Sequence, residues 1–323
     1  MDKYIISGGR RLEGGVRIQT AKNSVLPILA ASVLTDEPVT VLNVPDISDV
    51  RNMVRILGCL GCRARYSGND IIIDSSSADN CEIPRALAHE LRSSVFLLGS
   101  VISRFRKAKI AYPGGCDIGL RPVDLHLTGL KRLGVEITES NGYINCVCDK
   151  LAGNEIMLDC PSVGATENIM LAAVKAEGVT TIKNAAREPE IEDLQNFLNS
   201  MGAKVRGAGT GTVVIEGVQK LGGSVYQPIA DRIEAGTFLI ASAMCGGEVE
   251  LSGVNAENLS SLLHKLRENG CKLRIKNDKI YIKSDKRPVS VKSVETQPYP
   301  GFPTDLQAQM TALCCICRGQ SIV

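Results

Sequence analysis

Two kinds of apolar pattern alternate along this chain. The first kind is a run of small and aliphatic residues that is apolar on every side of the helix it predicts, and a short β-branched segment follows each run. A helix without a polar face is typical of a buried position in a globular core. Such runs occupy residues 23–34, 93–103, 165–176, 235–244 and 306–317.

The second kind is an amphipathic helix that ends in glycine and leads into two strands joined by a polar turn. Glycine suits this end because the backbone there must adopt a positive φ. The marker glycines Gly61, Gly134, Gly202 and Gly270 are 73, 68 and 68 residues apart. The pattern therefore predicts an internal repeat of about seventy residues, in the order helix, strand, helix, strand, turn, strand.

One such unit cannot close a core by itself. Several copies can bury their apolar helices together with the sheets outside, so we expect α/β globular domains. The fifth copy reaches a predicted strand at residues 321–323 and stops there, before its second helix and hairpin. The pattern thus predicts a chain that is truncated in its C-terminal part.

Length and composition narrow the class of protein. The 323 residues suffice for about two domains. A composition of 44% hydrophobic and 22% charged residues excludes disorder and fibrous repeats. The formal charge of +2 does not favour a nucleic-acid partner. No apolar run reaches the roughly 18 residues of a membrane span, and the N-terminus lacks a signal peptide. We expect a cytoplasmic protein with reduced cysteines and no membrane contact.

Ionisable or small polar residues stand at the start of each apolar helix. Backbone N–H groups and the helix dipole favour anions there, so a cleft where several such ends converge would bind a multiply charged anion. The alternative is that these are ordinary first-turn residues, and this is the preferred interpretation for Glu234. The residues are Lys22, Arg92, Thr166, Arg232 with Glu234, and Asp305.

A loop rich in glycine and proline holds the densest group of reactive residues. Its composition excludes a regular helix at residues 113–122, so Cys116 and Arg121 are expected on a loop. Of the twelve cysteines, only Cys116 stands in a polar glycine-rich loop near an arginine. That setting favours the thiolate, and hence proton donation or nucleophilic attack.

The remaining cysteines and the histidines give little sign of chemistry. Most of these cysteines fall in apolar runs and indicate core positions. The spacing of Cys59 and Cys62 matches a zinc motif, but without a second pair core packing is the preferred interpretation. His126 is interpreted as a helix-surface residue, and no metal site is predicted.

Two further loops resemble ligand contacts. Residues 161–168 place serine and glycine before a helix, where either Ser162 or Thr166 caps the helix or free backbone donors contact a ligand. Residues 297–305 form a proline-rich segment that delivers Asp305 to a helix start. This carboxylate either caps its helix or acts as general base toward a hydroxyl.

Four motifs, in this order and spacing, make the sequence resemble the UDP-N-acetylglucosamine enolpyruvyl transferases (1-carboxyvinyltransferases), which have the EPSP synthase-like fold. The resemblance covers essentially the whole chain. The motifs are Ala21-Lys22-Asn23-Ser24, the segment from Pro113-Gly114-Gly115-Cys116 to His126, Ser162-Val163-Gly164-Ala165-Thr166-Glu167, and Pro298-Tyr299-Pro300-Gly301-Phe302-Pro303-Thr304-Asp305.

The resemblance implies an inside-out α/β barrel of two domains built from βαβαββ units. Residues 22–229 would form a domain of three repeats with the cysteine loop and the nucleotide contacts. Residues 1–21 and 230–323 would form the second domain, incomplete at its C-terminus. The family transfers the enolpyruvyl group of phosphoenolpyruvate to the 3′-hydroxyl of UDP-N-acetylglucosamine and releases phosphate. This is the first committed step of peptidoglycan synthesis, which serves cell wall biogenesis, cell shape and cell division, and it needs no metal or organic cofactor.

The resemblance also assigns roles by motif. Lys22, Arg92 and Arg121 would bind the phosphoenolpyruvate anion, and Lys22 and Arg121 would stabilise the phosphate charge that develops. Asn23 and Asp305 would contact the amino sugar. Cys116 would be the acid and form a covalent phospholactoyl adduct, Asp305 would be the base or orient the hydroxyl, and fosfomycin would alkylate Cys116. The uridine diphosphate would be surrounded by Arg121, Pro122, Val123, Asp124, Leu125, Ser162, Val163 and Gly164.

Two departures and two rival interpretations accompany the resemblance. Cys160 stands where some members have a lysine near the nucleotide, and family chains extend past Val323 to supply another phosphate-binding arginine. One rival is the shikimate-pathway enolpyruvyl transferase, which lacks the Gly-Gly-Cys loop. The other is a protein that binds the nucleotide sugar without turnover.

Overall fold

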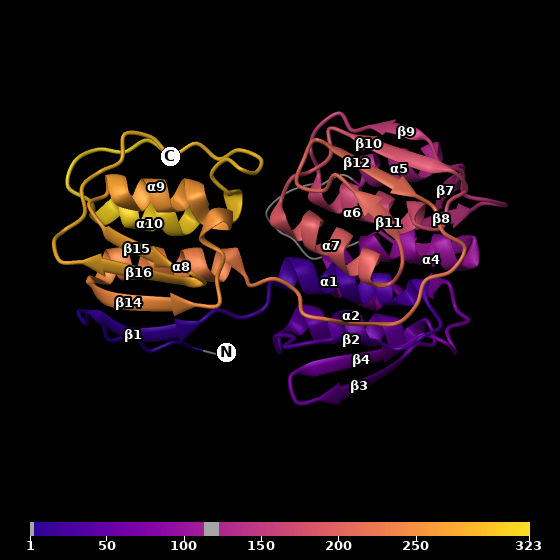
Figure 1. Ribbon diagram of the computed structural model, residues 1–323, viewed down its shortest axis with the longest axis horizontal. Coiled ribbons are helices and arrows are strands. Elements are labelled where there is room, and N and C mark those ends of the chain that lie inside the picture. The colour runs from indigo at the N-terminus through magenta and orange to yellow at the C-terminus, as the bar shows by residue number, and fades with distance from the viewer. Residues whose placement is uncertain (1–2, 113–122) are drawn as a thin grey trace. The chain divides into compact units, whose positions relative to one another are not determined.

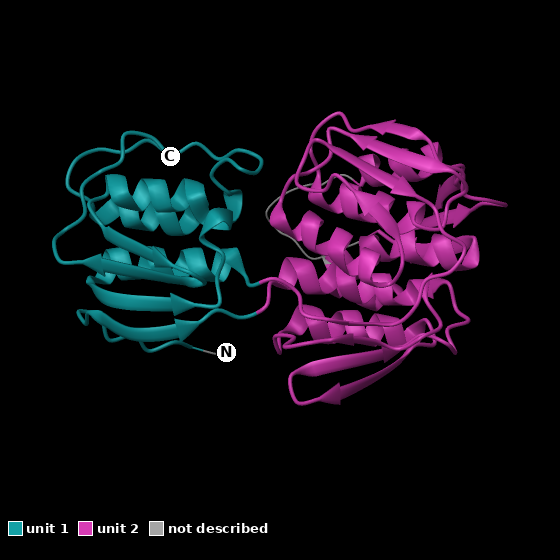
Figure 2. Cartoon of the chain, in the orientation of Figure 1, with its two compact units in different colours: residues 1–19, 230–323 teal, residues 20–229 magenta. Residues whose placement is uncertain are grey.

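The computed structural model describes residues 3–112 and 123–323, with Arg92 described by its backbone alone. Three expected site residues, Cys116, Arg121 and Pro122, lie outside the described residues. The chain divides into two compact units, shown in separate colours in Figure 2. Unit 1 comprises Met1–Gln19 and Ala230–Val323, and unit 2 comprises Thr20–Ile229.

Unit 2 contains three copies of the repeat. The first has α1 (Lys22–Ala31), η1 (Ser32–Leu34), β2 (Val39–Val41), α2 (Ser48–Cys59), β3 (Arg63–Ser67) and β4 (Asp70–Asp74). The second has β5 (Glu82–Ile83), α3 (Arg85–Glu90), η2 (Arg92–Phe96), α4 (Leu97–Phe105), β6 (Lys107–Ala111), α5 (Asp124–Arg132), β7 (Glu136–Ser140) and β8 (Tyr143–Val147). The third has β9 (Glu155–Met157), α6 (Val163–Ala173), β10 (Val179–Lys183), α7 (Pro189–Ser200), β11 (Lys204–Arg206) and β12 (Thr212–Glu216), and β13 (Ser224–Tyr226) follows.

Unit 1 contains a fourth copy and the start of a fifth. Its elements are β1 (Leu12–Arg17), α8 (Arg232–Cys245), β14 (Gly247–Ser252), η3 (Ala256–Leu259), α9 (Ser260–Glu268), β15 (Lys272–Lys276), β16 (Lys279–Ser284), η4 (Thr304–Leu306) and α10 (Gln307–Ile316). Helix α8 packs on β14 and β16, and α10 packs on α8.

The four-stranded sheets of the described residues all have the same pairing, which confirms the repeat. In each sheet the first strand runs parallel to the second, and the other two pairings are antiparallel. The strand orders are β1-β14-β16-β15, β13-β2-β4-β3, β5-β6-β8-β7 and β9-β10-β12-β11. The strand β13 reaches back to β2, so unit 2 closes on its first copy.

The apolar helices form the core of unit 2, as their composition predicts. Every residue from Ser24 to Ala31 in α1 and from Ala165 to Ala173 in α6 is buried. Figure 1 shows α1 and α6 between the sheet that contains β2 and the sheet that contains β10. The strands lie outside: β3 is exposed throughout, while β4 turns Ile71 and Ile73 inward. This arrangement of buried helices and outer sheets is the one predicted from the sequence.

The marker glycines terminate their helices in the expected conformation. The φ angles of Gly61, Gly134, Gly202 and Gly270 are 91°, 93°, 95° and 90°, a region that residues with a side chain rarely adopt. The predicted strand at residues 321–323 is wrong. Ile322 makes only an isolated bridge to Ser293, so this segment has too little pairing to form a strand.

The cysteines are less uniformly buried than their apolar surroundings suggested. Cys62, Cys146, Cys148, Cys271 and Cys317 are buried as expected. However, others lie on outward faces of their segments and are exposed: Cys59, Cys160, Cys245 and Cys315. Among the described residues, no helix is both long enough and apolar enough to span a membrane.

Candidate functional site

Helix α1 presents Lys22 and Asn23 at its first two positions. Both residues are exposed, whereas the helix is buried from Ser24 onward. The ammonium of Lys22 lies 3.1 Å from a carboxylate oxygen of Asp49, and both side chains are substantially exposed. Ion pairs of this kind contribute about 0–1 kcal/mol, so this pairing leaves the ammonium able to bind another anion.

Helix α6 begins with Ser162 as its N-cap, so of the two candidate caps it is Ser162, and not Thr166, that caps the helix. The Ser162 hydroxyl accepts a hydrogen bond from the Ala165 N–H at 3.3 Å. The hydroxyl of Thr166 instead accepts from the Ala186 N–H at 3.1 Å and so holds the segment before α7. Val163 and Gly164 occupy the first turn, where backbone donors have no partner within the helix.

Helix α5 begins next to α6. Asp124 is exposed, Leu125 is half-buried and Val123 is buried at the N-cap. The interpretation of His126 as a surface residue is wrong: its side chain is buried, and its Nδ1 lies 3.1 Å from the amide nitrogen of Asn168 in α6. The sequence assigned His126 to the exposed face of α5, but α6 packs against α5 there and covers the ring.

Helix α7 connects the start of α6 to the start of α1. Glu167 in α6 is fully buried, and burial, with the charges of Glu190 and Glu188, raises the pKa of its carboxyl well above 4.5. Both of its oxygens lack a hydrogen-bond partner among the described residues. Asp193 lies in α7, one turn after Glu190, and its carboxylate accepts a hydrogen bond from the Ile229 N–H at 3.1 Å.

Burial also raises the pKa of Asp193, while a hydrogen bond from the Tyr226 hydroxyl at 2.7 Å opposes that shift. The carbonyl of Ile229 in turn accepts from the Ala21 N–H at 2.8 Å, immediately before Lys22. The start of α1 is thus linked to α7 through Ile229 and Asp193, and α5 contacts α6 through His126 and Asn168. Of the helix starts predicted to converge, those of α1 and α6 are linked in this way through α7, and an anion cleft between them stays a prediction. The backbone of Arg92 begins η2, which packs on α6.

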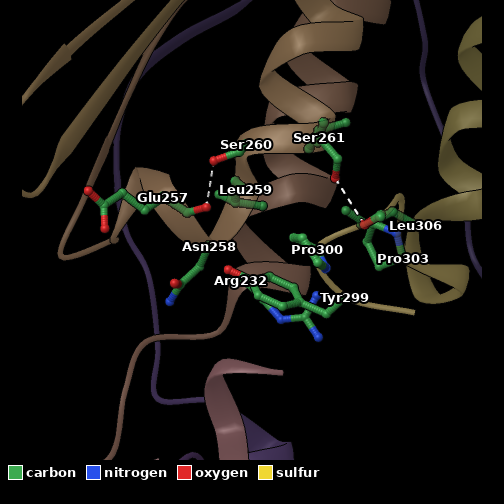
Figure 3. A pocket seen from close by; sticks show the side chains of 12 residues that line it. Arg232, Glu257, Asn258, Leu259, Ser260, Ser261, Tyr299, Pro300, Pro303 and Leu306 are labelled. Atoms are coloured by element: carbon green, nitrogen blue, oxygen red, sulfur yellow. Dashed lines mark hydrogen bonds between the residues drawn. The ribbon is translucent and has the colours of Figure 1, made fainter. Parts of the chain in front are cut away.

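Arg232 belongs to unit 1, where it lines a small pocket (Figure 3). Asp305 lies in the same unit, between Pro303 and Leu306, which also line that pocket. Arg232 is only 7% exposed, and its guanidinium lies 5.7 Å from the ring centroid of Tyr299. The hydroxyl of Ser261 donates to the Gly301 carbonyl at 3.2 Å and holds the same segment. Arg232 thus packs against the proline-rich loop in the wall of this pocket.

The same loop carries Asp305 into η4. Asp305 is exposed, and its side chain caps neither η4 nor α10, so of the two predicted roles the capping one is wrong. The next residue, Leu306, is fully buried against Gly236 and Leu262. The loop thus fixes the backbone of Asp305 while leaving its carboxylate accessible.

Glu234 has the structural role preferred from the sequence. Its carboxylate accepts from the Gln19 N–H at 2.7 Å, and Asp231 caps α8 by accepting from the N–H groups of Ile233 and Glu234. The described residues contain no group of three or more histidine, cysteine, aspartate or glutamate side chains suited to a metal ion.

The chain was compared with known proteins. A family model for EPSP synthase (3-phosphoshikimate 1-carboxyvinyltransferase) matches residues 6–323. A relative from Caldanaerobacter subterraneus subsp. tengcongensis, named UDP-N-acetylglucosamine 1-carboxyvinyltransferase 2, is 55% identical over 323 residues. That match covers 100% of this chain and 78% of the relative. The chain belongs to the UDP-N-acetylglucosamine 1-carboxyvinyltransferases of the EPSP synthase family.

Other similar proteins support this family assignment. A Clostridium tetani relative with the same name is 49% identical over 327 residues, again covering 100% of this chain and 78% of the relative. Among solved structures, the enolpyruvyl transferase NikO from Streptomyces tendae superposes with a TM-score of 0.85 at 24% identity, over 97% of this chain and 74% of that one. EPSP synthase from Acinetobacter baumannii superposes with a TM-score of 0.75 at 17% identity, over 98% of this chain and 75% of that one. These structures establish the two-domain EPSP synthase-like fold.

Sequence reasoning missed the buried polar groups behind this candidate site. His126 was assigned to the helix surface, and Asn168 and Glu167 were given no role, although all three lie within or beside the motifs. One signal was available for Glu167, because it is the only charged residue in the otherwise apolar and small-residue helix α6. No comparable signal marks His126, whose partner Asn168 is distant in the sequence.

Proposed function

We propose that this protein transfers the enolpyruvyl group of phosphoenolpyruvate to the 3′-hydroxyl of UDP-N-acetylglucosamine and releases phosphate. The observation that carries the proposal is the 55% identity, over the whole chain, to a relative named for this reaction. The reaction is a step of peptidoglycan synthesis. The proposal includes a cytoplasmic location and a contribution to cell shape and division.

Helix starts in unit 2 supply the proposed anion contacts. Lys22, Arg92 and Arg121 bind phosphoenolpyruvate, and the exposure of Lys22 with its weak ion pair to Asp49 supports its part in this. The first turns of α5 and α6 contact the uridine diphosphate through Val123, Asp124, Leu125, Ser162, Val163 and Gly164, with Arg121 and Pro122 before them. The buried contacts that hold these two turns together support that assignment.

The chemistry needs an acid and a base toward the two substrates. The Cys116 thiol protonates the methylene carbon of phosphoenolpyruvate while the sugar 3′-oxygen bonds to the adjacent carbon and its proton passes to a base. Asp305 is that base or orients the hydroxyl, and its accessible carboxylate supports the role. Asn23 contacts the amino sugar. The Cys116 thiolate then takes back a proton from the new methyl group as phosphate leaves, which restores the double bond, while Lys22 and Arg121 stabilise the leaving phosphate.

Phosphate release measures the proposed function directly. The protein is incubated with phosphoenolpyruvate and either UDP-N-acetylglucosamine or shikimate 3-phosphate. Release only with the nucleotide sugar is expected, and release only with the shikimate ester would overturn the proposal in favour of the rival enzyme. Binding of the nucleotide sugar without phosphate release would favour a binding protein.

The role of Asp305 has its own test. Asp305→Ala should reduce turnover by about a hundredfold or more, in the range of a lost acid or base.

Fosfomycin provides a separate test of the thiol. We propose that it alkylates Cys116 in the presence of UDP-N-acetylglucosamine. The exposed thiols of Cys59, Cys160, Cys245 and Cys315 are internal controls in the same chain. Peptide mass mapping should place one adduct on Cys116, and an adduct on any of the four controls instead would contradict the assignment.

A further inference from the structure

The side chain of His126 is enclosed where α5 meets α6. It is 8% exposed although it lies at the third position of α5, between Leu125 and Leu127. Its Nδ1 lies 3.1 Å from the Asn168 amide nitrogen. A buried polar side chain generally needs a partner of fixed geometry, because an unsatisfied group costs about 1–3 kcal/mol.

Asn168 is itself held in one orientation. Its amide nitrogen donates to the Val95 carbonyl at 3.1 Å, and its amide oxygen accepts from the Gly99 N–H at 2.6 Å. Turning the amide over would oppose donor to donor and acceptor to acceptor at these two backbone groups. The nitrogen that faces His126 is therefore a donor, so Nδ1 of His126 accepts and Nε2 carries the ring proton.

Gly164 places the ring against the first turn of α6 as well. A β-carbon on Gly164 would lie 3.0 Å from Cε1 of His126 and 2.9 Å from Cε1 of Phe96, so the ring fills the space beside this glycine. One turn further along α5, a β-carbon on Gly129 would lie 2.2 Å from Cδ1 of Ile169. The two helices thus approach closely at two glycines, and His126 is the polar contact between them.

We propose that His126 is a positioning residue that sets the spacing between the first turns of α5 and α6, and thereby the affinity for the uridine diphosphate part of the substrate. The inference rests on the proposed function, which assigns Val123–Leu125 and Ser162–Gly164 to that group. Because the contact lies behind these turns, it acts on nucleotide binding and leaves the phosphoenolpyruvate contacts unchanged.

Two substitutions separate the ring nitrogens. His126→Asn puts an amide oxygen near the position of Nδ1 and can still accept from Asn168, whereas His126→Gln puts its polar atoms near Nε2 and loses that contact. We expect His126→Gln to raise the dissociation constant for UDP-N-acetylglucosamine about tenfold, the effect of one hydrogen bond, and His126→Asn less than about threefold. The KM for phosphoenolpyruvate should stay unchanged in both.

Calorimetric titration with UDP-N-acetylglucosamine provides the measurement, and His89→Gln, at an exposed position on α3, is the matched control. Wild-type affinity in His126→Gln, or equal weakening in both His126 variants, would overturn the inference. Absence of nucleotide binding by the wild-type protein would instead overturn the proposed function.

A second measurement does not depend on either variant folding. The chain has three histidines, so the ¹⁵N chemical shifts of His126 in histidine-labelled protein can be assigned by elimination, with substitutions at the exposed His89 and His264. Nδ1 of His126 should be the unprotonated nitrogen and Nε2 the protonated one. A protonated Nδ1 would exclude the contact with Asn168 and overturn the inference without reference to substrate.

Discussion

Replacing Glu167 with glutamine should change how the stability of unit 2 depends on pH. Glu167 is 1% exposed, its oxygens have no hydrogen-bond partner among the described residues, and Glu190 and Glu188 add negative charge nearby. Burial is the main cause that raises the pKa of this carboxyl well above 4.5 in the folded protein. In the unfolded chain the same carboxyl titrates near its ordinary pKa.

The sign and the size of the effect follow from proton linkage. Above pH 4.5 the folded state retains a proton that the unfolded state has released, so the free energy of unfolding falls as pH rises. One proton corresponds to about 1.4 kcal/mol per pH unit until the pH reaches the folded-state pKa. The stability that this retained proton contributes is fully present below pH 4.5 and is lost as the pH rises through the folded-state pKa. Glu167→Gln removes the titration, so the variant should gain up to about 1.4 kcal/mol on the wild type for each pH unit between pH 4.5 and the folded-state pKa.

Urea unfolding followed by far-ultraviolet circular dichroism, at several pH values from 5 to 8, measures this difference. Glu136→Gln, at an exposed glutamate on β7, is the matched control and should give a profile parallel to that of the wild type. Parallel profiles for Glu167→Gln and the wild type would show that Glu167 is ionised in the folded protein and would refute the reasoning.

Four further substitutions or labels test other contacts. Gly99→Ala would place a β-carbon 2.2 Å from the Asn168 carbonyl oxygen and should lower the free energy of unfolding by about 1–3 kcal/mol in urea titrations, so unchanged stability would disprove close packing of α4 on α6. Tyr226→Phe removes a donor from buried Asp193 and should cost about 1–3 kcal/mol in the same assay. Burial raises the pKa of the Cys146 thiol to about 12, so iodoacetamide should label it on the order of a thousandfold more slowly than an unshifted thiol, as mass spectrometry would reveal. Cys160→Lys should tighten UDP-N-acetylglucosamine binding by up to about fivefold in calorimetry, and weaker binding would argue against a diphosphate near that position.

The repeat and the layer arrangement could be predicted because they depend on local patterns. A glycine at a helix end, an apolar helix and an alternating strand each leave a signal within a few residues. Gly61 and its counterparts, and helices α1 and α6, follow that pattern closely. The segment at residues 321–323 shows the limit, since a local strand pattern does not supply the neighbouring strand that pairing requires.

The polar groups behind the candidate site could not be predicted in this way. His126 occupies a position that local periodicity assigns to the surface, and its burial depends on α6, more than thirty residues further along the chain. The side chain of Arg232 likewise packs on Tyr299, a partner more than sixty residues away that no local pattern indicates. Cys116 and Arg121, the strongest predictions of chemistry, lie outside the described residues and stay predictions.

The product of the reaction gives the most direct test of the central claim. The protein is incubated with phosphoenolpyruvate and UDP-N-acetylglucosamine, and phosphate and nucleotide sugar are measured together by colorimetry and mass spectrometry. We predict one phosphate released for each nucleotide sugar that has gained an enolpyruvyl group in place of a hydroxyl proton. Phosphate release without that gain in mass, or an unchanged nucleotide sugar after full incubation, would contradict enolpyruvyl transfer by this protein.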